Sequence, residues 1–224
     1  MGDESMLTRR GLILGGAALA GMAAPRAHAA AVLTDDGLYR QPWFLESFLE
    51  LGDDLDGASK AGKRFAVMWE LRGCPYCKET HLVNFARPEI EDYIKANFEI
   101  LQLNIVGSRK VKDFDGTEIG EKALAAKYGV RFTPTFQFFP ESPEGLAQLA
   151  PEKREVARAP GYLRPDDFLA LFRYVREKGY ETKSFRDYLR AARLTSTPSV
   201  RSSTSWDRIA YVDAAQLLDP APCS

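Results

Sequence analysis

Hydrophobic and polar positions along the chain follow two periods, one typical of helices and the other of strands. Spacings of three and four residues indicate amphipathic helices that pack an apolar face on a core. The first such stripe runs from Trp43 through Phe44, Phe48, Leu51, Leu55 and Ala58. Helices are accordingly predicted for residues 43–58, 88–98, 118–128, 165–175 and 185–189.

Strand-like segments lie between these helices. Short apolar runs and strict alternation of apolar with polar residues both indicate strands. Strands are therefore predicted for residues 65–69, 99–105, 132–139 and 155–159. The polar stretch 107–116 is predicted to be surface, with an exposed excursion near a functional site as the alternative. The resulting order of elements indicates a central sheet with helices on both faces.

The motif Cys74-Pro75-Tyr76-Cys77 follows the first predicted strand and begins a helical stretch. A helix that starts near Cys74 places Cys77 about one turn later on the same side, so the two sulfurs can form a disulfide with little backbone movement. The unpaired N–H groups and the positive dipole end of that helix favour a thiolate at Cys74. Pro75 suits the first turn, where its missing N–H costs nothing. The spacing predicts a redox-active dithiol, with a structural disulfide or half of a zinc site as alternatives.

The composition of the chain argues against metal and haem sites. The chain has 224 residues, 45% of them hydrophobic, which is enough for one ordinary core. Zinc needs three or four ligands, and only His81 and the distant Cys223 could join the pair. Lys78 stands where covalent haem attachment would need a histidine. These counts argue against a metal site, and a redox-active dithiol implies no bound organic cofactor. Cys223 is interpreted as an incidental exposed thiol, with a mixed disulfide to a partner as the alternative.

The first thirty residues have the pattern of an export signal. Thr8-Arg9-Arg10 precedes the uncharged segment 11–24, and Ala27-His28-Ala29 offers a small-x-small cleavage site. The pattern is typical of a twin-arginine signal peptide, and the apolar segment is too short for a comfortable membrane span. Cleavage after this signal would leave 27 basic and 29 acidic side chains. A net charge of −2 gives no indication of nucleic-acid binding.

The Cys-x-x-Cys helix, followed by a strand, a helix and then Thr133-Pro134-Thr135 before an apolar strand, resembles the thioredoxin superfamily over residues 43–178. The resemblance implies an α/β, thioredoxin-like fold: a central mixed sheet with helices on both faces, here with a C-terminal helical extension. It also implies a cis bond before Pro134, next to the reactive sulfur, since X–Pro is the bond type for which a cis peptide costs little. A trans proline that starts the strand is the alternative. Pro75, Tyr76, Thr133 and Pro134 would then support the two cysteines.

Within the superfamily, the chain is most similar to the exported SoxW-like thioredoxins of bacterial sulfur-oxidation systems. The similarity is carried by Gly73-Cys74-Pro75-Tyr76-Cys77, Asp113-Phe114-Asp115-Gly116, Phe132-Thr133-Pro134-Thr135 and Gly161-Tyr162-Leu163. It implies electron transfer from a membrane thiol–disulfide transporter to disulfide-bearing periplasmic proteins. The chain would divide into a signal peptide (1–30), an irregular lead-in (31–42), a thioredoxin-like domain with a C-terminal helix (43–193) and a Ser/Thr/Pro-rich tail (194–224).

The chain departs from cytosolic thioredoxins at one important position. Those proteins carry a buried Asp six residues before the first cysteine, where this chain has Met68. Glu70 is the acid nearest that strand end and is a candidate base for Cys77, with a solvated or capping carboxylate as the alternative. Lys78 and His81 follow Cys77 on the motif helix and are candidates for tuning its thiol chemistry, or else are merely solvated or packed.

The sequence as a whole predicts an exported thiol–disulfide oxidoreductase that acts as a reductase. Cys74 would attack a substrate disulfide, and Cys77 would then release the reduced substrate. A DsbA-like oxidase and a redox-inert binding module are the alternatives. Pro134 follows Cys77 by 57 residues, which leaves no room for the large inserted helical domain of DsbA-like proteins and so favours the reductase.

Overall fold

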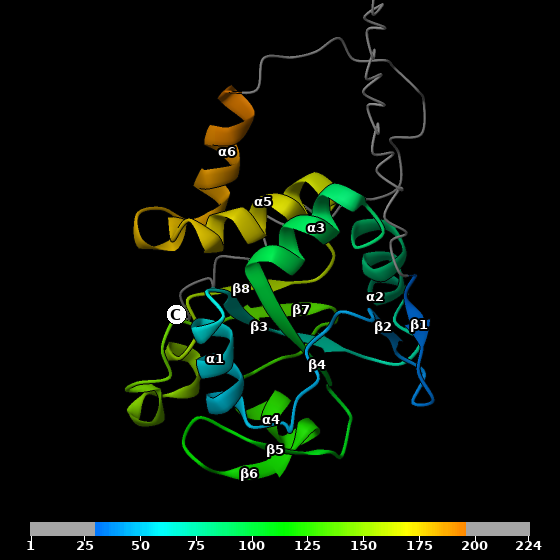
Figure 1. Ribbon diagram of the computed structural model, residues 1–224, viewed down its shortest axis with the longest axis vertical. Coiled ribbons are helices and arrows are strands. Elements are labelled where there is room, and N and C mark those ends of the chain that lie inside the picture. Colours follow the sequence, from blue (N-terminus) through cyan, green and yellow to red (C-terminus); the bar gives the residue numbers. More distant parts are fainter. Residues whose placement is uncertain (1–29, 196–224) are drawn as a thin grey trace, which may run out of the picture.

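A four-stranded mixed sheet forms the centre of the protein in a computed structural model that describes residues 30–195 (Figure 1). The strand order is β4-β3-β7-β8. The strands are β3 (Arg64–Glu70), β4 (Phe98–Asn104), β7 (Thr135–Phe138) and β8 (Ala157–Pro160). β3 is parallel to β4 and antiparallel to β7, and β8 is antiparallel to β7. All seven residues of β3 are buried, as expected for a strand between two neighbours and two layers of helices.

Helices cover both faces of this sheet, which confirms the predicted fold class. The helices are α1 (Leu51–Lys60), α2 (Pro75–Glu79), α3 (Pro88–Asn97), α4 (Glu121–Lys127), α5 (Pro165–Arg176) and α6 (Phe185–Thr195). Figure 1 shows α3 and α5 on one face and α1 and α4 on the other. Pro75, Pro88 and Pro165 each occupy a first turn, where proline costs no hydrogen bond.

Two hydrophobic clusters hold the layers together, one on each face. Under α3 and α5 the core is largely aromatic, and the Phe98 and Phe172 rings meet edge to face with 4.8 Å between centroids. Under α1 and α4 the core is mostly aliphatic and includes Leu55, Leu124 and the Trp69 ring. Edge-to-face pairs add to the hydrophobic gain, so the aromatic layer fixes how α5 lies on the sheet.

The helix predicted from Trp43 starts only at Leu51. Leu49 has a positive φ of 64°, and the Phe48 side chain is 99% exposed instead of packed on the core. Backbone hydrogen bonds explain the difference: Leu45 donates its N–H to the Ile100 carbonyl of β4, and Lys112 donates to the Leu49 carbonyl. These long-range bonds keep the segment extended although its spacing of apolar residues is helical.

The polar stretch after β4 was predicted to be surface, and that prediction is wrong in part. β5 (Lys110–Lys112) pairs with β6 (Glu118–Gly120) as an antiparallel hairpin, so α4 begins at Glu121 and not at residue 118. Val111 and Asp113 are buried beneath this hairpin. Three-residue strands are too short to show a period in the sequence.

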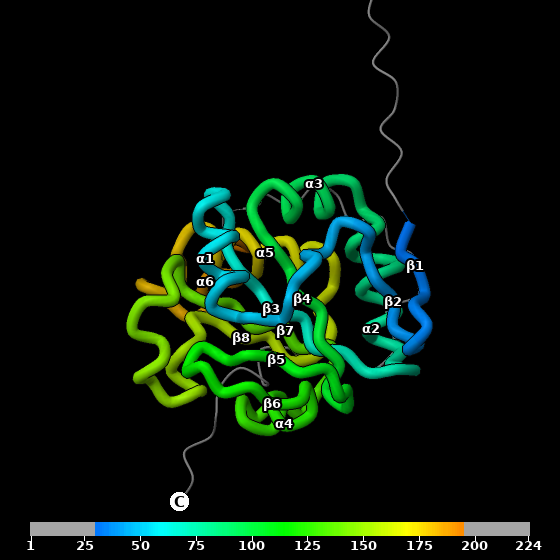
Figure 2. The backbone as a smooth tube through the Cα atoms, turned by 60° about the horizontal axis from the view of Figure 1, so that its bottom comes forward, coloured from blue at the N-terminus to red at the C-terminus, as the bar shows by residue number. Residues whose placement is uncertain are grey.

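The lead-in is likewise not irregular throughout. β1 (Val32–Leu33) and β2 (Tyr39–Arg40) form a small antiparallel hairpin. Figures 1 and 2 both show this hairpin beside α2, at the end of the molecule that carries the cysteine motif. Residues 1–29 of the predicted signal peptide and residues 196–224 of the predicted tail, including Cys223, lie outside the described residues.

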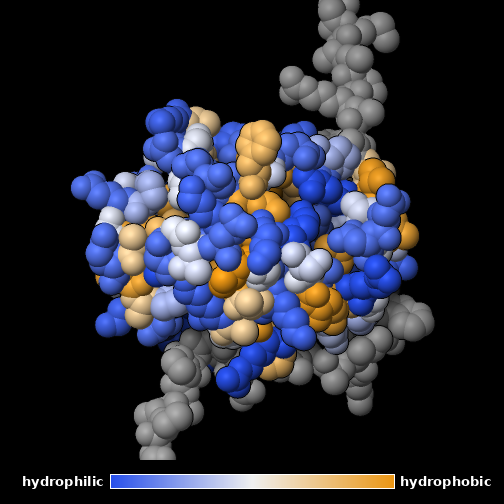
Figure 3. Space-filling model, turned by 90° about the horizontal axis from the view of Figure 1, so that it is seen from below, coloured by the Kyte–Doolittle hydropathy of each residue, from blue (hydrophilic) through white to orange (hydrophobic). Residues whose placement is uncertain are grey.

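The outer surface of the α4, β5 and β6 side is mostly hydrophilic, with apolar side chains in small separate groups (Figure 3). This view looks at the molecule from below relative to Figure 1. Between residues 30 and 195 no helix combines the length and the hydropathy needed to cross a bilayer.

Candidate functional site

The cysteine motif begins a helix directly after the central strand, as the sequence predicts. β3 ends at Glu70, and the turn that follows places Gly73 at a φ of +76°. Glycine adopts this left-handed conformation without steric cost. Cys74 then takes the N-cap position of α2 with an extended backbone, and Pro75 is the first helical residue. The end of a central strand thus holds the first sulfur at a helix N-terminus.

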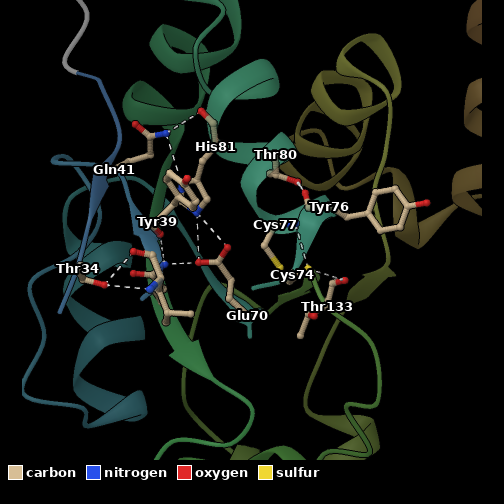
Figure 4. Close-up of polar contacts among 12 residues, drawn as sticks. Thr34, Tyr39, Gln41, Glu70, Cys74, Tyr76, Cys77, Thr80, His81 and Thr133 are labelled. Atoms are coloured by element: carbon tan, nitrogen blue, oxygen red, sulfur yellow. Dashed lines mark hydrogen bonds and ion pairs between the residues drawn. The ribbon is translucent and has the colours of Figure 1, made fainter. Parts of the chain in front are cut away.

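The two thiols have different surroundings, although both are free (Figure 4). Cys74 is partly exposed, and its Sγ accepts a hydrogen bond of 3.1 Å from the Cys77 N–H. Cys77 is only 4% exposed. Burial raises the pKa of the Cys77 thiol, and the hydrogen bond with Cys74 and the negative charge of Glu70 raise it further. Cys74 is therefore the sulfur that a substrate can reach, and Cys77 is the sulfur that is held in reserve.

This difference predicts selective alkylation. Iodoacetamide at pH 7 should label Cys74 roughly tenfold or more faster than Cys77, because each unit of pKa changes the thiolate population tenfold and burial adds a barrier to access. The measurement is peptide mass spectrometry of the reduced full chain carrying Cys223→Ser. Faster labelling of Cys77 would contradict the assignment of the two roles.

The peptide bond between Thr133 and Pro134 is cis, as predicted, and lies next to the motif. The Cys74 thiol donates to the Thr133 carbonyl over 3.4 Å. Pro134 is buried, and its carbonyl accepts a 2.7 Å hydrogen bond from the Gly161 N–H. The loop before β7 is thereby held between the cysteines and the segment that leads into α5.

Two tyrosines form the exposed side of the site. The Tyr76 ring is 54% exposed and stacks on the Tyr162 ring, with 6.0 Å between centroids and 21° between planes. Tyr162 donates its hydroxyl to the Asn84 side chain, whose amide donates to the Leu163 carbonyl. These contacts join the motif helix to the loop before α5. Tyr162 appeared in the sequence only within a family pattern, with no role attached to it.

Glu70 and His81 form a buried pair behind Cys77. Each is 1% exposed, and His81 Nε2 lies 3.0 Å and 3.2 Å from the two carboxylate oxygens of Glu70. The alternative of a solvated Glu70 is wrong, and His81 is packed and not solvated. Lys78, the third candidate for tuning the thiols, is exposed on α2. The fold therefore brings two of the three candidates together and leaves Lys78 in solvent.

Two glutamines complete this cluster, and the sequence did not reveal either of them. Gln102 donates its amide to Glu70 and to the Tyr39 carbonyl. Gln41 places its amide nitrogen 3.3 Å from His81 Nδ1 and 3.1 Å from the His81 carbonyl. Gln102 occupies a polar position of an alternating strand, which normally faces water, and Gln41 lies in the lead-in. No local pattern marks either residue.

Phe44 and Phe85 enclose the His81 ring, with centroid separations of 5.6 Å and 5.5 Å. The cluster is therefore shielded from water by side chains that come from both sides of the motif. Within residues 30–195 no group of three or more His, Cys, Asp and Glu side chains is arranged to bind a metal ion. The chemistry that the described site can perform is that of its two thiols and the buried Glu70–His81 pair.

Several solved structures are similar to part of this chain. A thioredoxin-fold protein from Helicobacter pylori is 24% identical to the chain, covering 59% of this chain and 81% of that chain, with a TM-score of 0.43. A thioredoxin from Thermus thermophilus is 24% identical over 57% and 84% of the two chains, with a TM-score of 0.42. The oxidised C-terminal domain of DsbD from Neisseria meningitidis is 18% identical over 55% and 90%, with a TM-score of 0.35.

A search of curated proteins found no significant match. The model of one family, described as the thioredoxin-like domain, matches residues 51–176, which is more than half of the chain. This matched region contains both cysteines of the motif, the cis-proline loop and the whole central sheet. The chain therefore belongs to the thioredoxin-like domain family.

Proposed function

We propose that this protein is an exported thiol–disulfide reductase that reduces disulfides in periplasmic partner proteins. Membership of the thioredoxin-like family supports thiol–disulfide oxidoreductase chemistry in general. The observation that carries the proposal is the difference between the two thiols. Cys74 is accessible at the start of a helix, and its Sγ accepts a hydrogen bond from the Cys77 N–H, whereas the Cys77 thiol is buried. The presence of both thiols also argues against the alternative that the protein is a binding module without redox activity.

The reaction would proceed in two exchange steps. The Cys74 thiolate attacks one sulfur of the substrate disulfide, forming a mixed disulfide and releasing the other substrate sulfur as a thiolate. Cys77, deprotonated, then attacks Cys74 Sγ. The Cys74–Cys77 bond forms, the bond to the substrate breaks, and two electrons have passed from the dithiol to the substrate, whose sulfurs take up protons.

Substrate would lie across the surface beside Cys74. The Thr133 carbonyl is within hydrogen-bond reach of Cys74 Sγ, so an extended substrate segment paired with this backbone would bring its disulfide to the reactive sulfur. The exposed rings of Tyr76 and Phe132 offer apolar contact with such a segment. Recognition by backbone and by rings tolerates many sequences, which suits an enzyme whose substrates are folded or partly folded proteins.

The proposed reductase would be exported and would receive its electrons through the membrane. The twin-arginine pattern at Arg9 and Arg10 would direct the protein out of the cytoplasm. Because the periplasm is kept oxidising, an exported reductase must be recharged from inside the cell, and a membrane thiol–disulfide transporter is the implied donor. The similarity to SoxW-like thioredoxins suggests a role in sulfur oxidation.

The redox state in living cells tests the proposal. We expect the exported protein to be found mainly as the dithiol and to become a disulfide when the membrane thiol transporter is deleted. The measurement is acid quenching of whole cells followed by thiol alkylation and a gel shift of the protein. A variant with Arg9→Lys and Arg10→Lys, retained inside the cell, should stay reduced in both strains and serves as the control.

The opposite result would favour the DsbA-like alternative. A protein that is mostly disulfide-bonded in unperturbed cells, and that readily oxidises reduced unfolded substrates, would be an oxidase using the same two sulfurs in reverse.

A further inference from the structure

We propose that Gln41, from the segment before the matched thioredoxin-like region, completes a buried proton acceptor for Cys77. The acceptor is the Glu70–His81 pair, and it acts when Cys77 resolves the mixed disulfide. The inference rests on the proposed function and deepens it. It assigns a positioning role to a residue that lies outside residues 51–176, the region matched by the family.

The hydrogen bonds around His81 determine which ring nitrogen carries the proton. The His81 carbonyl can only accept, so the group of Gln41 that lies 3.1 Å from it must be the amide NH2. The same amide nitrogen is 3.3 Å from His81 Nδ1, which must therefore accept as well and carries no proton. The ring proton then resides on Nε2, which donates to the Glu70 carboxylate. Gln41 thus holds His81 in one neutral tautomer.

The pair consequently carries a single negative charge, located on Glu70. If Nδ1 were protonated, its N–H would face the N–H of the Gln41 amide, and two donors repel each other. A proton released by Cys77 is therefore taken up by the Glu70 carboxylate and not by the ring. Gln102 and His81 both donate to Glu70 and hold it in place. A buried charge supported only by donors is costly unless it is fully hydrogen-bonded. Each Glu70 oxygen has a donor in this cluster, and Oε1, whose one hydrogen-bond contact among the described residues is His81, keeps a lone pair that can take a proton.

Titratable and charged groups approach the pair from α2, from β2 and from the segment after β4. From α2 the buried Cys77 thiol feels the Glu70 charge, and from β2 the Tyr39 ring lies 6.3 Å from the His81 ring. The Arg109 guanidinium donates to the Gln102 carbonyl and to the Glu121 carboxylate, so its charge is already paired. Figure 4 shows Glu70 on the side of His81 that faces the two cysteines. Cys77 is accordingly the proton donor that this arrangement serves.

In the mixed-disulfide state the Cys77 S–H bond breaks and its proton passes to a Glu70 oxygen, leaving the electron pair on sulfur. That thiolate forms the bond to Cys74 Sγ, and the substrate sulfur leaves with the electron pair of the broken disulfide. The leaving thiolate is then protonated by water, and Glu70 returns its proton to solvent. An internal acceptor is needed because Cys77 is only 4% exposed.

One reagent separates the two exchange steps. The aromatic disulfide DTNB releases one coloured thiolate when Cys74 attacks it and forms a mixed disulfide. It releases a second coloured thiolate when Cys77 attacks that mixed disulfide. In the full chain carrying Cys223→Ser, Glu70→Gln should slow the second release at pH 7 by roughly 100-fold, the usual contribution of a positioned acid or base. The first release should stay within about twofold of the parent, which also shows that the variant is folded.

The sign of the Glu70→Gln effect is decisive. A Glu70 that acts only through its charge raises the pKa of Cys77, so its removal would speed the second release. A second release that is unchanged or faster, with a normal first release, overturns the inference and leaves the proposed function intact. Loss of the first release in the parent protein would instead overturn the proposed function.

Gln41→Leu tests the positioning role. Without the amide donor, the ring proton of His81 is no longer held on Nε2, so the second release should slow by roughly tenfold while the first release stays within about twofold of the parent. Gln137→Leu is the matched control, since this buried glutamine bonds to Trp69 and Glu155 and not to the pair. A second release in Gln41→Leu that is as fast as in the parent and in Gln137→Leu would overturn the role of Gln41.

Discussion

Replacement of Cys77 by serine is expected to convert the protein into a trap that stays joined to its substrates. Cys74 remains partly exposed and keeps its place at the start of α2, so the first exchange still occurs. The second exchange has lost its nucleophile, because serine is not deprotonated near neutral pH and cannot displace a disulfide. Multiple-turnover reduction of a protein disulfide such as that of insulin should fall below detection.

The measurement is a non-reducing gel of cells or of purified mixtures, with mass spectrometry of the adduct. Adducts should be abundant in Cys77→Ser, absent in Cys74→Ser, and still present when Cys223→Ser is added to Cys77→Ser. Adducts that vanish with Cys223→Ser would place the reactive thiol at Cys223, and adducts that persist in Cys74→Ser would place it at a cysteine other than Cys74. Either result would contradict the assignment of the site.

Asp113→Ala is expected to lower the free energy of unfolding by about 3 kcal/mol, the low end of the cost of breaking a buried charge pair. Asp113 is 3% exposed and accepts from Arg154 at 2.8 Å and from the Tyr128 hydroxyl at 2.7 Å. Lys127 also lies 2.6 Å away. Arg154 is itself 3% exposed, so its charge would be left in the interior with Asp115 as the remaining carboxylate.

Urea denaturation monitored by circular dichroism measures this loss. Asp56→Ala is the matched control, because Asp56 pairs with Lys60 on the exposed side of α1 and should cost only about 0.5 kcal/mol. A further Arg154→Leu change in the Asp113→Ala background should recover part of the stability by removing the unpaired charge. Equal losses for Asp113→Ala and Asp56→Ala would show that the buried cluster contributes little to folding.

Asp113 is buried although it lies in a short polar segment, which the sequence pattern predicts to be surface. Its stretch is polar in sequence and was predicted to be surface, but the β5–β6 hairpin and Arg154, 41 residues away, cover it. Phe48 shows the converse error, because its helical spacing predicted a buried side chain that the hydrogen bonds of Leu45 and Lys112 turn outward. In both cases contacts between distant segments outweighed the local pattern.

Local chemistry was enough to locate the dithiol. Proline at a first turn, a helix N-terminus after an apolar strand and three-residue cysteine spacing are all short-range features, and the structure shows them at Cys74, Pro75 and Cys77. The starts of α3 and α5 follow from Pro88 and Pro165 for the same reason. The cis bond at Pro134 was expected from the family resemblance, because the residues alone establish only that such a bond is affordable there.

The sequence by itself therefore determined the α/β fold class, most of the elements and the two sulfurs, because these depend on periodicity and on helix-end chemistry within a few residues. Only the tertiary structure decided the surroundings of Cys77. Glu70 and His81 meet across 11 residues, Gln102 reaches Glu70 across 32, and Gln41 reaches His81 across 40. The sequence around a polar side chain does not predict whether water or a distant residue will satisfy its hydrogen bonds. In this protein the fold supplies the hydrogen-bond partners and excludes water.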